Sequence, residues 1–195
     1  FFTIISRGLG FLGDIFVAFF LGKGFFADVF FVAFRIPNTF RRLFSEGTFN
    51  AAFVPSYASE LVKGKKQSNK FANQVLNILL ISLLVIVLIV QLFMPTFVSL
   101  IAPGFSDDKE KIDFAINLTR ITFPFLMFIS LASFFSAILN SHNKFAAAAA
   151  APIILNIILI IILFFSKIIG DNLVYFLSYG VTLSGLIQLI FLYFF

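Results

Sequence analysis

Long apolar segments are the feature that most constrains the fold of this chain. The hydrocarbon core of a bilayer is about 30 Å thick, and a helix that crosses it needs about 20 apolar residues. Six segments approach or exceed that length, at residues 1–21, 25–61, 71–101, 112–139, 146–166 and 173–195. Only 12% of the residues are charged, against roughly a quarter in an ordinary globular domain. Because backbone in lipid must satisfy its own hydrogen bonds, the pattern predicts an all-α, polytopic transmembrane bundle of about six helices.

Prolines and glycines predict where these segments bend or end. The second segment is too long for one crossing, so we expect Pro37 and Pro55 to bend it, with its far end leaving the membrane. Pro103 and Gly104 end the third segment, and Pro124 lies inside the fourth.

Both ends of the sequence lie in apolar runs, and the first residue is Phe. We therefore expect a fragment cut at both ends. The first segment is not predicted to be a cleaved signal peptide, because Arg7 and Asp14 interrupt its apolar run.

The distribution of lysines predicts the orientation. Lys63, Lys65, Lys66 and Lys70 lie between the second and third segments, whereas the connection from 104 to 113 contains four acids and two lysines. Basic connections face the cytoplasm, so the N-terminus is expected inside. The net charge of +5 is then a topology signal, and no nucleic-acid partner is predicted.

Ionisable residues inside the first two segments are the candidate site. Each such group costs about 2.5–3.5 kcal/mol at the centre of a membrane, so these groups are expected to face a protein interior or a water-filled cavity. Asp28, Arg35 and Arg42 repeat every seven residues, a spacing that drifts only about 20° around a helix per repeat. The set predicts a polar groove through the membrane: Arg7, Asp14, Asp28, Arg35, Arg41, Arg42 and Glu46.

A simpler interpretation stays open for several of these residues. Arg41, Arg42 and Glu46 could lie at the cytoplasmic headgroups, and Arg7 at an interface, where they would only set the topology. Asp28 could lie at the outer mouth and stabilise the N-terminal end of its own helix.

Several kinds of chemistry are not predicted. The chain has no cysteine and a single histidine, His142, so thiolate catalysis, disulfides and a metal site have no candidate ligands. No nucleophile and base lie at a catalytic spacing. We therefore predict no enzyme activity and no cofactor.

Four motifs carry a family resemblance that covers nearly all 195 residues. The strings are SRGLGFLGD (6–14), ADVFFVAFRIPNTFRRLFSEGTFNAAFVP (27–55), APGF (102–105) and RITFPF (120–125). They resemble the MurJ/MviN lipid II flippases of the multidrug/oligosaccharidyl-lipid/polysaccharide exporter superfamily. The resemblance implies that residues 1–195 form most of the N-terminal lobe of a bacterial inner-membrane protein with fourteen helices in two lobes, the second lobe being missing.

The same resemblance implies a function and a set of cavity residues. The function is transfer of the undecaprenyl-pyrophosphate-linked peptidoglycan precursor, lipid II, across the inner membrane by alternating access, with lipid II and membrane lipids as partners. The matching cavity residues are Ser6, Arg7, Asp14, Asp28, Arg41, Arg42 and Glu46. One position departs from the family motif, because Gly13 stands where an arginine is expected directly before Asp14.

Three alternatives remain at this point. A flippase for another polyprenyl-linked saccharide, of the O-antigen type, would need the same cationic groove. A drug or cation antiporter would be expected to have membrane acids without the arginine cluster. A membrane enzyme acting on polyprenyl phosphates would need an acidic or acid–base motif in a cytoplasmic loop, and those loops contain lysines instead.

Overall fold

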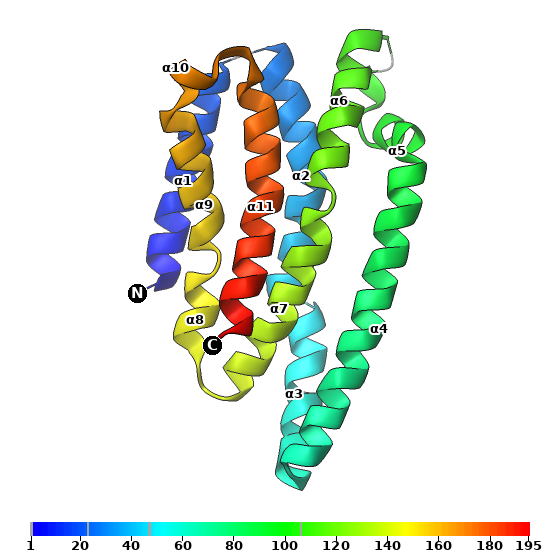
Figure 1. Cartoon of the computed structure of the whole chain (residues 1–195), viewed down its shortest axis with the longest axis vertical. Helices are drawn as coiled ribbons and strands as arrows, with labels where there is room; N and C mark the ends of the chain where they lie inside the picture. Colours follow the sequence, from blue (N-terminus) through cyan, green and yellow to red (C-terminus); the bar gives the residue numbers. More distant parts are fainter. Residues whose placement is uncertain (1, 23, 47, 106) are drawn as a thin grey trace.

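The computed structural model describes the backbone of residues 2–22, 24–46, 48–105 and 107–195, and within these the side chains of all but residues 2–7, 14, 36, 40–46 and 48. All regular secondary structure in the described residues is helical (Figure 1). The elements are α1 (Phe2–Leu21), α2 (Phe25–Glu46), α3 (Thr48–Lys63), α4 (Lys65–Leu92), α5 (Met94–Ile101), η1 (Pro103–Phe105), α6 (Lys109–Thr122), α7 (Phe125–Ser141), α8 (Phe145–Ala150), α9 (Ile153–Phe164), α10 (Ser166–Ile169), η2 (Gly170–Asn172) and α11 (Leu173–Tyr193).

The long helices have the length and composition of membrane spans. Within the described residues four helical stretches qualify, at Lys65–Leu92, Lys109–Ser141, Phe145–Phe164 and Ser166–Tyr193. In α1 the described apolar stretch, Gly8–Leu21, is shorter than these four stretches. The predicted multi-pass, all-α membrane bundle is thus confirmed. The third predicted segment, 71–101, differs from the prediction, because α4 begins earlier, at Lys65, and ends at Leu92, and Met94–Ile101 form the separate helix α5.

The central helix of the bundle is α11, which packs against α7 and α9 (Figure 1). On either side, α2 packs against α6 and α7, while α1 packs against α8 and α9. Leu118, Phe125 and Leu177 are fully buried where these helices meet. Two glycines bring α11 close to its neighbours: a Cβ added at Gly180 would lie 2.4 Å from Ile162 Cδ1, and one at Gly185 would lie 2.6 Å from Phe125 Cδ2.

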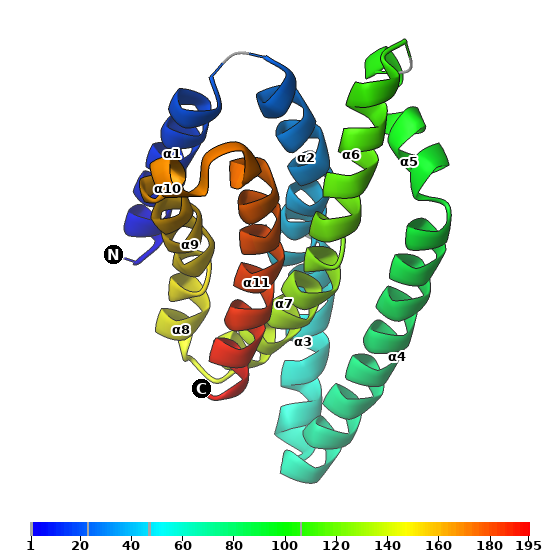
Figure 2. The same cartoon turned by 45° about the horizontal axis from the view of Figure 1, so that its top comes forward.

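The connections separate by charge between the two ends of the bundle. The lysine-rich α3–α4 connection and the α7–α8 connection, which contains His142 and Lys144, lie at one end. Figure 2 shows the α1–α2 connection, the start of α6 and α10 at the other end. This second end carries the acidic residues between 107 and 113, so the two kinds of connection that the sequence distinguished are on opposite ends.

The prolines of the second predicted segment lie inside helices. Helix α2 continues through Pro37 and ends at Glu46, and α3 begins at Thr48 and continues through Pro55. The bend expected at each of these prolines stays a prediction. Pro124 and Pro152 do coincide with breaks, between α6 and α7 and between α8 and α9.

A neighbouring side chain replaces the hydrogen bond that each of two prolines removes. Proline has no amide hydrogen, so the carbonyl four residues earlier loses its helical donor. Thr122 Oγ1 of α6 donates to Ala33 O, the carbonyl left by Pro37, at 2.7 Å. Gln91 Nε2 of α4 donates to Arg120 O, the carbonyl left by Pro124, at 2.8 Å.

The α6–α7 break has a second such contact. Thr182 Oγ1 of α11 donates to Ile121 O, the carbonyl next to that of Arg120. In a membrane, an unpaired carbonyl costs far more than in water, because no solvent replaces the lost donor. Polar side chains on α4, α6 and α11 therefore make these two prolines compatible with a helix in lipid.

Candidate functional site

Helix α2 has one buried side and one open side. Val29, Phe30 and Ala33 are buried against the bundle. Asp28 and Arg35 lie on the other side and are exposed. Their separation of seven residues places both side chains within about 20° of each other around the helix. The structure therefore brings these two charged residues onto one open face.

The N-terminal end of this face holds an ion pair between two helices. Lys111 Nζ of α6 donates to Asp28 Oδ2 at 2.7 Å. The Asp28 side chain remains 54% exposed, whereas that of Lys111 is 20% exposed. The Lys111 ammonium also lies 4.5 Å from the centre of the Phe105 ring, a cation–π distance. The lysine is held between a carboxylate and an aromatic face.

The start of α6 explains why Lys111 is positioned there. Asp108 caps the helix by accepting a hydrogen bond from Lys111 N at 3.0 Å. Such a cap fixes the first turn of a helix and contributes about 1 kcal/mol. The aromatic rings of Phe25, Phe26 and Phe114 contact one another beside it. The cap and these rings fix α6 against the beginning of α2.

Arg35 lies further along the open face, about two helical turns from Asp28. Thr39 Oγ1 donates to Arg35 O at 2.8 Å, a contact within the helix near Pro37. Among the described side chains no carboxylate pairs with the Arg35 guanidinium. The Arg35 side chain is exposed, and a guanidinium can bind phosphate oxygens through two parallel hydrogen bonds.

The other predicted site residues cannot be placed in the same detail. Their side chains lie outside the described ones, and they stay predictions: Ser6, Arg7, Asp14, Arg41, Arg42 and Glu46. The structure assigns all six to α1 or α2 by their backbone.

Gly13 lies where α1 meets α9. It is buried, and a Cβ added to it would lie 3.8 Å from Asn156 Oδ1. A Cβ at Gly10 would lie 3.6 Å from Asn156 Nδ2. Any side chain at position 13 would thus begin beside Asn156 of α9.

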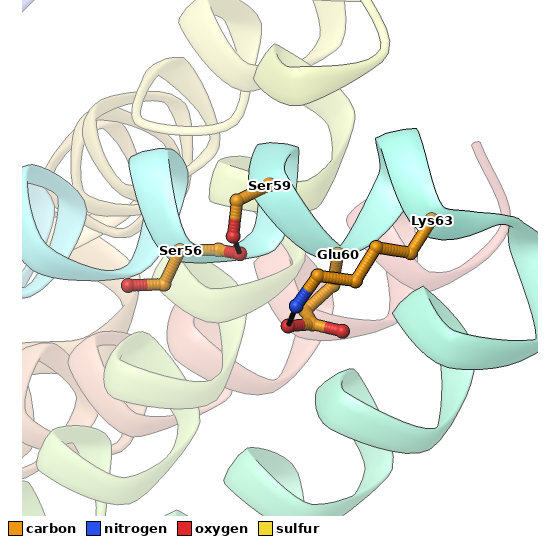
Figure 3. A network of polar contacts seen from close by, with 4 residues as sticks. All are labelled: Ser56, Ser59, Glu60 and Lys63. Carbon is orange, nitrogen blue, oxygen red and sulfur yellow. Dashed lines mark hydrogen bonds and ion pairs between the residues drawn. The ribbon is translucent and has the colours of Figure 1, made fainter.

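A second polar group, on α3, has only local contacts. Figure 3 shows Lys63 Nζ 2.6 Å from Glu60 Oε1, and Ser59 Oγ donating to Ser56 O at 2.8 Å. Ser56 Oγ donates to Ala52 O one turn earlier. Exposed pairs of this kind contribute about 0–1 kcal/mol. They are local contacts on the surface of a helix at the basic end.

Lys111 is the residue of this region that sequence reasoning missed. It was counted among the lysines of an acidic connection, and its partner Asp28 is 83 positions away. No periodicity joins residues so far apart, so only the packing of α6 on α2 reveals the pair. The described residues contain no group of three or more possible metal ligands.

Comparisons with known proteins agree with this architecture. The family model described as "Lipid II flippase MurJ" matches residues 17–195. The chain is 44% identical over 196 aligned residues to a probable lipid II flippase MurJ of Rhizobium tropici, covering 98% of this chain and 37% of that protein. It is 39% identical to the probable lipid II flippase MurJ of Rickettsia prowazekii, covering 99% of this chain and 38% of that protein.

A solved structure has the same fold. It is described as lipid II flippase MurJ in an inward closed conformation, and it superposes with a TM-score of 0.82 at 29% identity. The match covers 97% of this chain and 39% of the solved chain, so the sequence here spans well under half the length of the proteins it matches. This chain is a multi-pass membrane bundle with the same fold, and the family model matches its residues 17–195. The chain therefore belongs to the MurJ lipid II flippase family.

Proposed function

We propose that the protein of which this chain is a part moves lipid II from the cytoplasmic to the outer leaflet of the bacterial inner membrane. Residues 1–195 would form its N-terminal lobe, and a second lobe of similar size would complete the fourteen-helix transporter. The observation that carries the proposal is the open face of α2, where Arg35 is exposed and not paired with any described carboxylate. Family membership and the coverage of 37% of the Rhizobium tropici relative support it.

The physical task explains the arginines. A pyrophosphate cannot cross hydrocarbon without its charge being compensated, and guanidinium groups bind phosphate in a fixed two-pronged geometry. Arg35, with Arg41 and Arg42 further along α2, would supply those groups. Ser6, Arg7, Asp14, Asp28 and Glu46 complete the proposed polar lining, and the prenyl tail would stay in lipid.

Transfer in this proposal is conformational and involves no covalent catalysis. The substrate would be bound differently by an inward-open and an outward-open state, and that difference in affinity would drive the exchange. The N-terminus and the lysine-rich α3–α4 connection would be cytoplasmic, which agrees with the separation of basic and acidic connections between the two ends.

The proposal is tested by substituting Arg42 and Arg35 in the full-length protein. We expect Arg42→Ala and Arg35→Ala to insert normally, to bind lipid II more weakly and to lose transfer in a reconstituted vesicle assay. Arg42→Lys should recover only part of the activity, because a point charge lacks the two-pronged geometry.

Lys167→Ala is a matched control, since this exposed cation lies in the short connection at the acidic end. It should leave both lipid binding and transfer unchanged. Equal lipid II binding by the wild type and both arginine variants would contradict the proposed role of the arginines. Cleavage of the pyrophosphate by the purified protein would contradict a purely conformational mechanism.

A further inference from the structure

The break between α8 and α9 leaves a carbonyl without its helical donor. Pro152 has no amide hydrogen, so Ala148 O loses the bond that residue 152 would otherwise supply. At Pro37 and Pro124 a side chain from another helix donates to the corresponding carbonyl. No protein donor reaches Ala148 O among the described residues, so its hydrogen-bonding capacity requires another partner.

The side chain of Gln188 on α11 has a hydrogen-bond donor that lacks an acceptor in the described part of the chain. It is only 1% exposed, and its Nε2 is buried without a hydrogen-bond partner among the described residues. A buried donor left unsatisfied is unfavourable, because it has lost its hydrogen bonds to water and gained none in the protein. Gln188 thus has a buried spare donor, and the half-buried Ala148, with a spare acceptor, lies in the same part of the bundle.

A small cavity of about 20 Å³ connects them. Gln188, Ala148, Ser133 and Ser136 all line it, together with Ile129, Ala132, Ala151, Pro152 and Leu192. A space of about 10–15 Å³ is enough to hold one water molecule, provided that two to four polar groups surround it. The cavity therefore has room for one water molecule.

We propose that a single ordered water molecule binds in this cavity and joins α7, α8 and α11. It accepts a hydrogen bond from Gln188 Nε2 and donates one to Ala148 O. Ser133 Oγ already donates to Ile129 O at 2.8 Å, so it accepts the second hydrogen of the water. The Ser136 hydroxyl, which makes no hydrogen bond to another described residue, completes the set as a donor to the water.

The α8–α9 break then differs from the α6–α7 break in how its free carbonyl is bonded, through a water rather than directly by a side chain. Direct side-chain contacts fix Arg120 O and Ile121 O at distances set by the protein. A bridging water is enthalpically nearly as good as a direct contact, and it can turn and shift as the groups around it move. The α8–α9 break can therefore change its angle without leaving a carbonyl unpaired.

Radiolytic hydroxyl labelling of the full-length protein in detergent tests the proposal, because X-rays generate radicals from bound water and these label the adjacent side chains. We expect Ile129, 5% exposed, and Pro152 to be labelled at least fivefold more than Leu177, a fully buried residue of α11 that does not line the cavity. Gln188→Met keeps the shape of the side chain but removes the donor, and should bring the labelling of Ile129 down to that of Leu177.

A second variant and an ion control complete the test. Pro152→Ala returns an amide donor to Ala148 O and should also lower the labelling of Ile129. The wild-type labelling should be the same in sodium chloride and in choline chloride. Labelling of Ile129 and Pro152 no higher than that of Leu177 would overturn the proposal, and labelling that depends on sodium would replace the water by a monovalent cation.

Discussion

Lys111 Nζ lies 2.7 Å from Asp28 Oδ2 and ties the beginning of α6 to the beginning of α2. The pair is partly open to solvent, because the Asp28 side chain is 54% exposed. Screening by water limits what such a pair contributes to stability, to about 0–1 kcal/mol. The pair therefore matters mainly for position, because it fixes the N-terminal end of the helix that carries Arg35.

A charge exchange tests whether Asp28 has a role beyond this pair. Lys111→Asp and Asp28→Lys should each lower the thermal stability slightly, and the double variant should restore it. Under the proposed function, transfer of lipid II should stay impaired in the double variant, because the sign of the charge lining the route is reversed. Full recovery of both stability and transfer would mean that Asp28 serves only as the partner of Lys111.

The contact between Thr122 and Ala33 O predicts a coupled pair of substitutions. Thr122→Val removes the donor and should destabilise the detergent-solubilised protein by about 1 kcal/mol. Pro37→Ala should cancel this loss in the double variant, because an alanine amide again donates to Ala33 O. The measurement is a double-mutant cycle of unfolding free energies, with Thr122→Ser as the control that keeps the hydroxyl. Additive effects of Thr122→Val and Pro37→Ala would contradict the assigned contact.

Single cysteines on the two sides of α2 should differ in their reactivity toward a water-soluble reagent. The chain has no native cysteine, so single cysteines can be probed one at a time with a water-soluble thiol reagent. Cysteine at Asp28 or Arg35 should react, whereas cysteine at Phe30, which is 1% exposed, should not. Phe31 is 42% exposed and is unsuitable as a buried control. Equal reactivity at Phe30 and Arg35 would show that α2 does not have one open side.

The orientation is tested with cysteines at Lys66 and Glu110, both exposed and at opposite ends of the bundle. On intact spheroplasts an impermeant reagent should label Glu110→Cys and leave Lys66→Cys unlabelled until the membrane is opened. Ser68 is only 1% exposed, so a cysteine there would not label from either side. Labelling of Lys66→Cys alone would place the N-terminus outside.

Two glycine-to-alanine substitutions should have opposite effects. At Gly13 the new methyl would meet Asn156 at an ordinary contact distance of 3.8 Å, and alanine favours a helix over glycine by up to about 1 kcal/mol. At Gly185 it would lie 2.6 Å from the rigid Phe125 ring, and overpacking of this kind costs about 1–3 kcal/mol. Gly13→Ala should raise the melting temperature and Gly185→Ala should lower it. The reverse order would contradict the packing of α11 against α7.

The sequence predicts the membrane spans well. It does not predict which side chain bonds the carbonyl that a proline leaves without a donor. Segment length and hydropathy predict α4, α9 and α11 well, because lipid imposes a minimum length that any sequence must meet. Pro37 was expected to bend its segment because it removes a helical hydrogen bond. The carbonyl that Pro37 leaves without a donor, Ala33 O, accepts a hydrogen bond from Thr122 of α6, which is 89 positions later in the chain, and local reasoning does not include such a partner. The Lys111–Asp28 pair escaped prediction for the same reason.

The hydroxyl of Thr122 has a further consequence for how such a sequence can change over time. Thr122 Oγ1 lies 3.3 Å from Thr119 O in its own helix as well as 2.7 Å from Ala33 O. A threonine at this position would therefore be harmless before any proline appeared in α2, since it could bond within α6. A proline gained first would have left Ala33 O without a donor inside the bundle, where Ala33 is fully buried. Gaining the threonine before the proline is therefore the order that avoids an unpaired carbonyl at every step.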